Sequence, residues 1–94
     1  MPLTPDAAET LALQALGWLA SNEELLPVFM GATGVSQDDL RSQAGAPEFL
    51  ASVLDFLLMD DAWVMSCCEA LNRPYDTLIQ ARAALPGGAQ IHWT

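Results

Sequence analysis

Few residues in this chain could carry out covalent chemistry. Cys67 and Cys68 are adjacent, and His92 is the single histidine. A cysteine nucleophile needs a base within hydrogen-bond reach. Both cysteines lie in a segment with the apolar pattern of a helix, so a Cys–His pair would require the C-terminal end of the chain to fold against that helix. We therefore predict that both thiols are small apolar groups of the core.

Three acidic pairs are the other candidates for metal binding or proton transfer, namely Glu23-Glu24, Asp38-Asp39 and Asp60-Asp61. None belongs to a calcium loop, because no Asp-x-Asp-x-Asp-Gly pattern occurs. Two adjacent cysteines and one histidine do not have zinc-ligand spacing. Each pair stands at the predicted beginning of a helix, where capping and the helix dipole favour carboxylates. We predict no catalytic, cofactor-binding or metal-binding residues, no bound small molecule and no enzymatic activity. The alternative is an unrecognised cysteine or carboxylate site.

The composition indicates one acidic, apolar-rich domain. The chain has 94 residues, of which 52% are hydrophobic and 16% charged, and its net charge is −9. Such a charge repels phosphate backbones and anionic membranes, so we expect neither nucleic acid nor membrane partners. The first residues lack the basic region of a secretory signal, and no apolar run is long enough to span a membrane. Two adjacent cysteines make no disulfide framework, and the sequence therefore predicts a cytoplasmic protein.

The stretch 47–71 holds most of the large apolar side chains. On an ideal helix its first half is apolar around most of its girth, which places it in the middle of a bundle. The residues on that face are Phe49, Leu50, Val53, Leu54, Phe56 and Leu57. Asp60 or Asp61 can cap a second helix, on which Trp63, Val64, Cys67, Cys68 and Leu71 share a face. We predict a central helical hairpin with its helices at about 47–59 and 61–71.

Helix signals also occur before this hairpin. Thr4-Pro5 is a helix start, and the following apolar stripe contains Ala8, Leu11, Ala12, Ala15, Leu16 and Leu19. Ser21 to Glu24 matches a capping box for a second helix. Gly34 suits a left-handed helix end, and Ser36 to Asp39 forms an acidic capping box for a short helix over about 37–44.

After the hairpin, Asn72 can adopt the left-handed conformation that ends a helix. Pro74 then opens a last helix whose inward residues are Tyr75, Leu78, Ala81 and Leu85. No stretch alternates with the period of a strand. The predicted fold is therefore all-α, a compact bundle of five or six short helices. It forms a single helical domain over 1–88, followed by a short C-terminal tail at 89–94.

The segment 30–40 resembles the turn of a helix-turn-helix, with a glycine, an apolar residue, a serine cap and an inward leucine. In a DNA-binding protein the second helix would enter the major groove. Here the first turn of that helix carries Asp38 and Asp39, and Arg41 is its one cation. Carboxylates in this turn would be repelled by the phosphates of DNA. A degenerate helix-turn-helix regulator therefore remains an alternative function.

Four segments, 15–20, 34–41, 49–60 and 81–88, resemble those of a family of small helical proteins from alphaproteobacteria, a domain of unknown function. The resemblance covers roughly residues 7 to 88. It implies a cytoplasmic bacterial protein and carries no known activity or site residue.

The chain has few side chains that could take part in catalysis and many apolar ones. This composition favours a non-catalytic protein-interaction module. Its partner would be another protein or, in a homo-oligomer, a second copy of the chain. Aromatic and methionine side chains are enriched in interface cores. At the edges of the predicted apolar stripes or in loops, such residues define a candidate partner surface of Trp18, Phe29, Met30, Met59, Met65 and Trp93.

Overall fold

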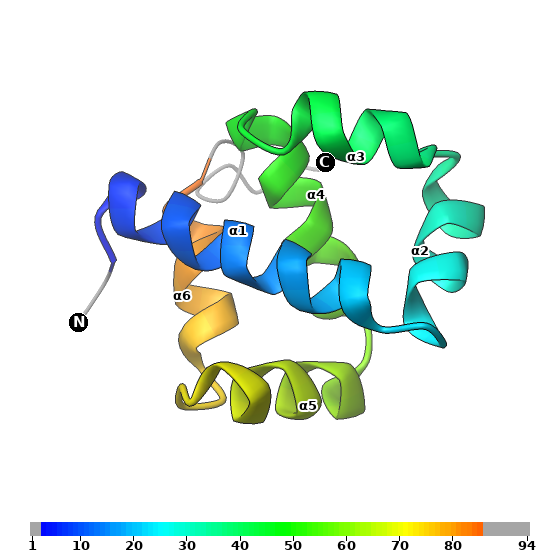
Figure 1. Cartoon of the computed structure of the whole chain (residues 1–94). Helices are drawn as coiled ribbons and strands as arrows, with labels where there is room; N and C mark the ends of the chain where they lie inside the picture. The colour runs from blue at the N-terminus through cyan, green and yellow to red at the C-terminus, as the bar shows by residue number, and fades with distance from the viewer. Residues whose placement is uncertain (1–2, 86–94) are drawn as a thin grey trace, which may run out of the picture.

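The computed structural model describes residues 3–85, which form six α-helices and no strand (Figure 1). The helices are α1 (Pro5–Ser21), α2 (Leu25–Thr33), α3 (Gln37–Gln43), α4 (Pro47–Leu57), α5 (Asp61–Leu71) and α6 (Thr77–Ala83). The prediction of an all-α bundle of five or six short helices is confirmed. No helix within these residues is long and apolar enough to cross a membrane. The predicted tail at 89–94 lies outside the described residues.

Side-chain caps begin three of the helices as predicted. The Thr4 hydroxyl accepts a hydrogen bond from the Ala7 amide and so caps α1. Ser36 and Asp39 form the reciprocal capping box of α3, in which each side chain accepts a bond from the other residue's amide. Asp60 accepts a bond from the amide of Ala62 at 2.8 Å and caps α5. These caps satisfy amide groups that have no partner within the helix.

Two residues adopt the left-handed conformation, and both were predicted at helix ends. Gly34 follows α2 with a φ of 75°, and Asn72 follows α5 with a φ of 63°. Glycine has no Cβ to clash there, and asparagine tolerates this region better than most residues do. Each residue turns the chain sharply, so that the next helix begins in a new direction.

Two predicted helix starts were misplaced. Ser21 does not cap α2, because it is the last residue of α1 and the side chain of Asn22 accepts bonds from the amides of Glu24 and Leu25. Pro74 does not open α6 directly. A turn at Pro74 to Asp76 comes first, closed by a bond from the Thr77 amide to the Pro74 carbonyl. The Asn22 side chain accepts the bonds that close the first turn, and the Pro74 carbonyl accepts the bond that closes the second.

The two helices of the predicted hairpin are present, but α1 is their main shared neighbour. Both α4 and α5 contact α1 more extensively than they contact each other. Figure 1 shows α1 crossing α4, while α5 runs across the lower end of α4 rather than alongside it. Alanines at 8, 12 and 15 are fully buried on the inner side of α1. Because these side chains are small, neighbouring helices can approach α1 closely.

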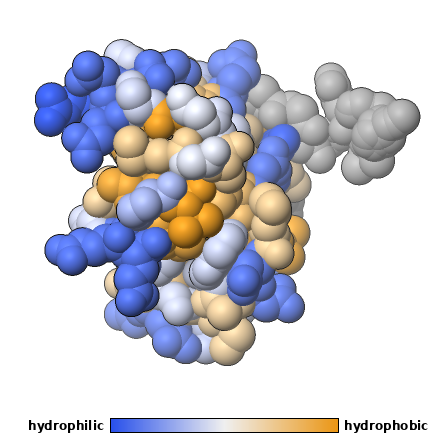
Figure 2. Space-filling model, turned by 90° about the vertical axis from the view of Figure 1, so that its right-hand side faces the viewer, coloured by the Kyte–Doolittle hydropathy of each residue, from blue (hydrophilic) through white to orange (hydrophobic). Residues whose placement is uncertain are grey.

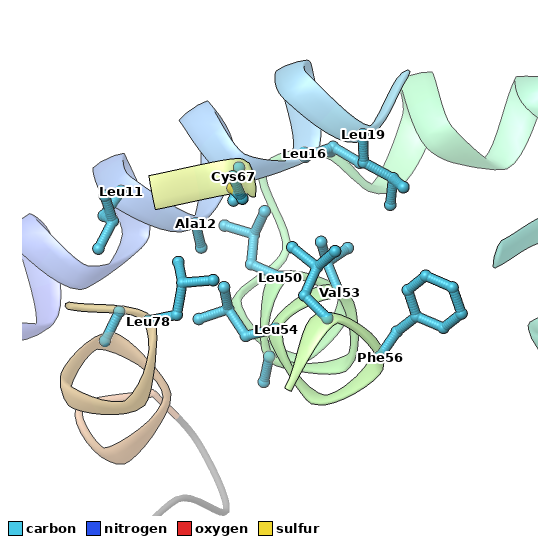
Figure 3. Close-up of a cluster of buried hydrophobic side chains, with 14 of the residues drawn as sticks. Leu11, Ala12, Leu16, Leu19, Leu50, Val53, Leu54, Phe56, Cys67 and Leu78 are labelled. Atoms are coloured by element: carbon cyan, nitrogen blue, oxygen red, sulfur yellow. The ribbon is translucent and has the colours of Figure 1, made fainter. Parts of the chain in front are cut away.

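The core is formed mainly by side chains of α1 and α4, with contributions from α5 and α6. Figure 3 shows Leu11, Leu16 and Leu19 of α1 on one side of it and Leu50, Val53 and Leu54 of α4 on the other. Cys67 and Leu78 reach the same core from α5 and α6. Leu54 is fully buried at its centre, as predicted.

Aromatic rings fill the space between α2 and α4. The Phe29 ring of α2 meets the rings of Phe49 and Phe56 edge-on, with centroids 6.4 and 5.1 Å apart. Trp63 of α5 stacks on Phe56 at 4.8 Å. Offset and edge-on ring pairs are favourable geometries for aromatic side chains. This aromatic cluster joins α2, α4 and α5.

Leu54→Ala should lower the free energy of unfolding by about 2–5 kcal/mol, because it leaves a cavity in a close-packed core. Denaturant titration followed by circular dichroism measures this quantity. Leu13→Ala is the matched control, since Leu13 is half exposed on α1 and its truncation should cost less than about 1 kcal/mol. Equal losses in the two variants would show that Leu54 is not at the centre of the core.

Gly34→Ala and Gly31→Ala should change the stability in opposite directions. At Gly34 the left-handed backbone strains any side chain, so alanine should destabilise by about 1 kcal/mol. Gly31 lies within α2, and nothing lies within 4 Å of a Cβ added there. Alanine at 31 should therefore stabilise by about 0.5–1 kcal/mol. The melting temperatures of the two variants measure these changes in stability. A shift of the same sign in both variants would contradict the prediction.

Candidate interaction surface

The two cysteines lie on α5 and are fully buried, as predicted. Burial, together with the nearby Cys68 thiol, raises the pKa of Cys67 to about 12. Burial also raises the pKa of Cys68. The Cys68 thiol points to the carbonyl oxygen of Tyr75, 4.0 Å away. Because the thiolate is the reactive form, this environment disfavours a nucleophilic role for either residue.

The acidic pairs lie apart, at three different helix starts. Asp39 and Asp60 serve as capping residues, and Glu23-Glu24 lies in the turn before α2. Within the described part of the chain, no three histidine, cysteine or acidic side chains come together as metal ligands could. His92 lies outside the described residues.

The residues of the predicted partner surface differ in exposure and lie in different parts of the structure. Met59 is 78% exposed and Met65 is 43% exposed. Trp18 and Met30 are partly buried against the core. Trp93 lies outside the described residues. The described members of the predicted set therefore include two exposed methionines, Met65 on α5 and Met59 in the turn before it.

The prediction for Phe29 was wrong. Its side chain is 0% exposed, so it cannot form part of a partner surface. The helical pattern of α2 placed Phe29 near an edge of its apolar face. The rings of Phe49 and Phe56, which lie twenty or more positions later in the sequence, cover that edge in the folded chain.

A shallow apolar hollow of about 310 Å³ lies between α5 and α6. We call its lining the α5–α6 surface, which comprises Leu58, Asp61, Val64, Met65, Tyr75 and Ile79. Ile79 is 59% exposed and Tyr75 is 49% exposed. Met59 lies in the connection between α4 and α5, directly after the lining residue Leu58. The surface thus presents aliphatic, thioether and aromatic groups together.

Carboxylates border the α5–α6 surface. Asp61 lies in its lining, and the Tyr75 hydroxyl donates a hydrogen bond of 2.6 Å to Glu69. This bond raises the pKa of Tyr75. It also holds the phenol ring in place at the edge of the hollow. On α6, Arg82 donates to Asp55 at 2.6 Å, which ties α6 to α4.

Sequence reasoning missed Tyr75 and Ile79 as surface residues. Tyr75 was predicted to point inward with Leu78, Ala81 and Leu85, of which the last three are buried as predicted. The exposure of Ile79 could have been recognised, because adjacent residues on a helix point about 100° apart. With Leu78, Ala81 and Leu85 on the buried side of this short segment, Ile79 lies away from the centre of that side.

A second apolar region lies on the face of the molecule that carries α2. Figure 2 shows this face, with apolar side chains gathered near its centre and hydrophilic ones around them. A hollow of about 280 Å³ there is lined in part by Trp18, Leu25, Val28 and Trp63. Trp18, a member of the predicted surface, thus contributes to this region and not to the α5–α6 surface.

The turn that resembles a helix-turn-helix is present between α2 and α3. Gly34 makes the turn and Ser36 caps the following helix, as the sequence pattern predicts. However, α3 is only seven residues long and has no buried residue. Its first turn carries Asp38 and Asp39, which do not favour contact with phosphates.

The stability of the protein should fall at alkaline pH because of Cys67. Its pKa is 9.0 ordinarily and about 12 in the folded chain, so the unfolded chain loses this proton first. The free energy of unfolding should therefore decline as the pH rises from about 9 towards 12, and this thiol should have no effect below pH 9. Urea titrations between about pH 8 and pH 11 measure the decline.

Cys67→Ala should make that decline shallower. A residual slope should remain, because the raised pKa of Tyr75 acts in the same direction. Ser66→Ala is the control on the same helix and should leave the slope unchanged. Equal slopes in the wild type and in Cys67→Ala would show that Cys67 does not cause the decline.

Comparison of the sequence with known proteins assigns the chain to a family. No curated protein and no solved structure matches the chain. Residues 5–88 match the family model described as "Protein of unknown function (DUF3572)". The match spans all six helices and extends over nearly the same residues as the resemblance noted in the sequence. The chain belongs to the DUF3572 family.

Proposed function

We propose that the protein is a small, acidic, non-catalytic interaction module that binds a protein partner through the α5–α6 surface. One observation carries the proposal. Among the described residues, the large hydrophobic side chains that are exposed are Leu13, Val28, Met59, Met65, Tyr75 and Ile79. Of these six, Met65, Tyr75 and Ile79 line the α5–α6 surface, and Met59 directly follows the lining residue Leu58 in the chain.

The chemistry of these side chains suits a partner interface. Methionine and aromatic residues are enriched in interface cores, and methionine adapts its shape to different partners. Burying one half-exposed side chain of this size contributes about 1 kcal/mol. The hydrogen bond between Tyr75 and Glu69 restricts the ring before binding, which reduces the entropy lost when a partner docks.

The charge of the molecule favours a basic partner. Its net charge is −9, and Asp61 lies within the apolar lining. A partner with lysine or arginine around its own apolar centre would be attracted over long range and oriented on approach. Two copies of this chain would repel each other for the same reason, so we place a foreign protein ahead of a homo-oligomer.

The proposal includes a cytoplasmic location. Both cysteines are free thiols in the core rather than disulfide partners. Free buried thiols are common in reducing compartments.

Met65→Glu and Ile79→Glu should each weaken partner binding at least about tenfold, because a carboxylate would be buried in an apolar contact. Affinity capture from the native cell with the wild type and the variants as baits, followed by quantitative mass spectrometry, measures this. Ala70→Glu is the matched control, since it adds the same charge at another exposed position of α5.

A protein retained by the wild type and by Ala70→Glu but lost by both surface variants supports the proposal. Light scattering over a concentration series tests whether that partner is a second copy. If no captured protein distinguishes Met65→Glu from Ala70→Glu, the α5–α6 surface is not the binding site.

A further inference from the structure

A groove runs between α1 and α3, and it shares no lining residue with the α5–α6 surface. Its main part has a volume of about 430 Å³ and is lined by Leu13, Leu16, Gly17, Ala20, Leu40 and Ala44, with Arg41 as the one charged residue. Gly17 and Ala20 are exposed, and nothing lies within 4 Å of a Cβ added at Gly17. The small residues therefore leave room for another chain to approach the backbone of α1.

The groove carries acidic residues at one end and a single basic residue in its other part. Past Leu13 and Ala44, which line both parts, a hollow of about 280 Å³ continues to Asp6 and Glu9 in the first turns of α1. Arg41 lies on the other part, and it forms no ion pair within residues 3–85. From Asp6 to Ala20 the groove follows α1 for about 21 Å at 1.5 Å per residue.

The geometry points to an amphipathic helix of a partner protein as the occupant of this groove, lying antiparallel to α1. Its apolar stripe would contact Leu13, Leu16 and Leu40. An acidic residue in its first turn would pair with Arg41. Basic residues in its last turn would pair with Asp6 and Glu9.

This direction follows from the charges. Helices are stabilised by acidic side chains in the first turn and basic ones in the last turn. Such a helix places opposite charges against Asp6, Glu9 and Arg41 in the antiparallel direction and like charges against them in the parallel one. About fourteen residues, or roughly four turns, span the groove. Packing of an apolar helix face into a groove between helices is a common mode of peptide recognition.

The test uses two synthetic peptides of about fourteen residues. Both carry leucine at every third or fourth position and an internal lactam that equalises their helicity. The first has glutamates in the first turn and lysines in the last, and the second has these charges exchanged. Their composition and net charge are identical, so attraction to the acidic protein as a whole is the same for both. Calorimetry on the full chain should show a preference of about fivefold or more for the first peptide.

Gly17→Leu should lower the affinity for the first peptide at least about tenfold, because the new side chain occupies the groove. Gly31→Leu is the matched control, since it makes the same change at an exposed glycine of α2 that also has open space around it. Ile79→Glu should leave peptide binding unchanged, which separates this site from the α5–α6 surface. Arg41→Gln should reduce the preference between the two peptides.

Three results would overturn the inference. They are equal affinity for the two peptides, wild-type affinity in Gly17→Leu, and no binding of the first peptide at millimolar concentration. Circular dichroism of Gly17→Leu confirms that a loss of binding is not a loss of fold.

Discussion

The packing of α1 against α4 is the contact on which the rest of the structure depends. It joins the longest helix to the one that is apolar around most of its girth. Fully buried alanines on α1 let α4 come close, and leucines between them supply the apolar contact. Since helices this short are marginal by themselves, this burial stabilises both elements. The other helices pack around this pair.

This arrangement explains why apolar groups remain at the surface. On α5 and α6 the inward positions are taken by Cys67, Cys68, Leu78 and Ala81, which are small or of moderate size and fully buried. Met65 and Ile79 then point outward, since each helix has only one side against the core. A similar limit applies to α3, which has no buried residue and leaves a groove beside α1. A chain of this size has a small core, so part of its apolar surface remains exposed.

The two proposed binding regions differ in their electrostatics. At the α5–α6 surface the lining charge is Asp61, so the local field and the net charge of the molecule have the same sign. The groove beside α1 has Arg41 on one part and Asp6 and Glu9 on the other, which favours one direction of docking.

The sequence by itself determined the fold class and most of the helix ends. Caps such as Ser36 with Asp39, and left-handed residues such as Gly34 and Asn72, act within a few positions of the chain, so their patterns can be recognised locally. The apolar stripes predicted the buried faces for the same reason, including both cysteines. The tertiary structure decided which stripe edges remain open. Phe29 is buried because rings distant in the sequence cover it, and Tyr75 is exposed because a turn separates it from α6. Neither the closing of an edge by a distant helix nor the hollow between α5 and α6 is encoded in any single segment, because both depend on how helices pack against each other.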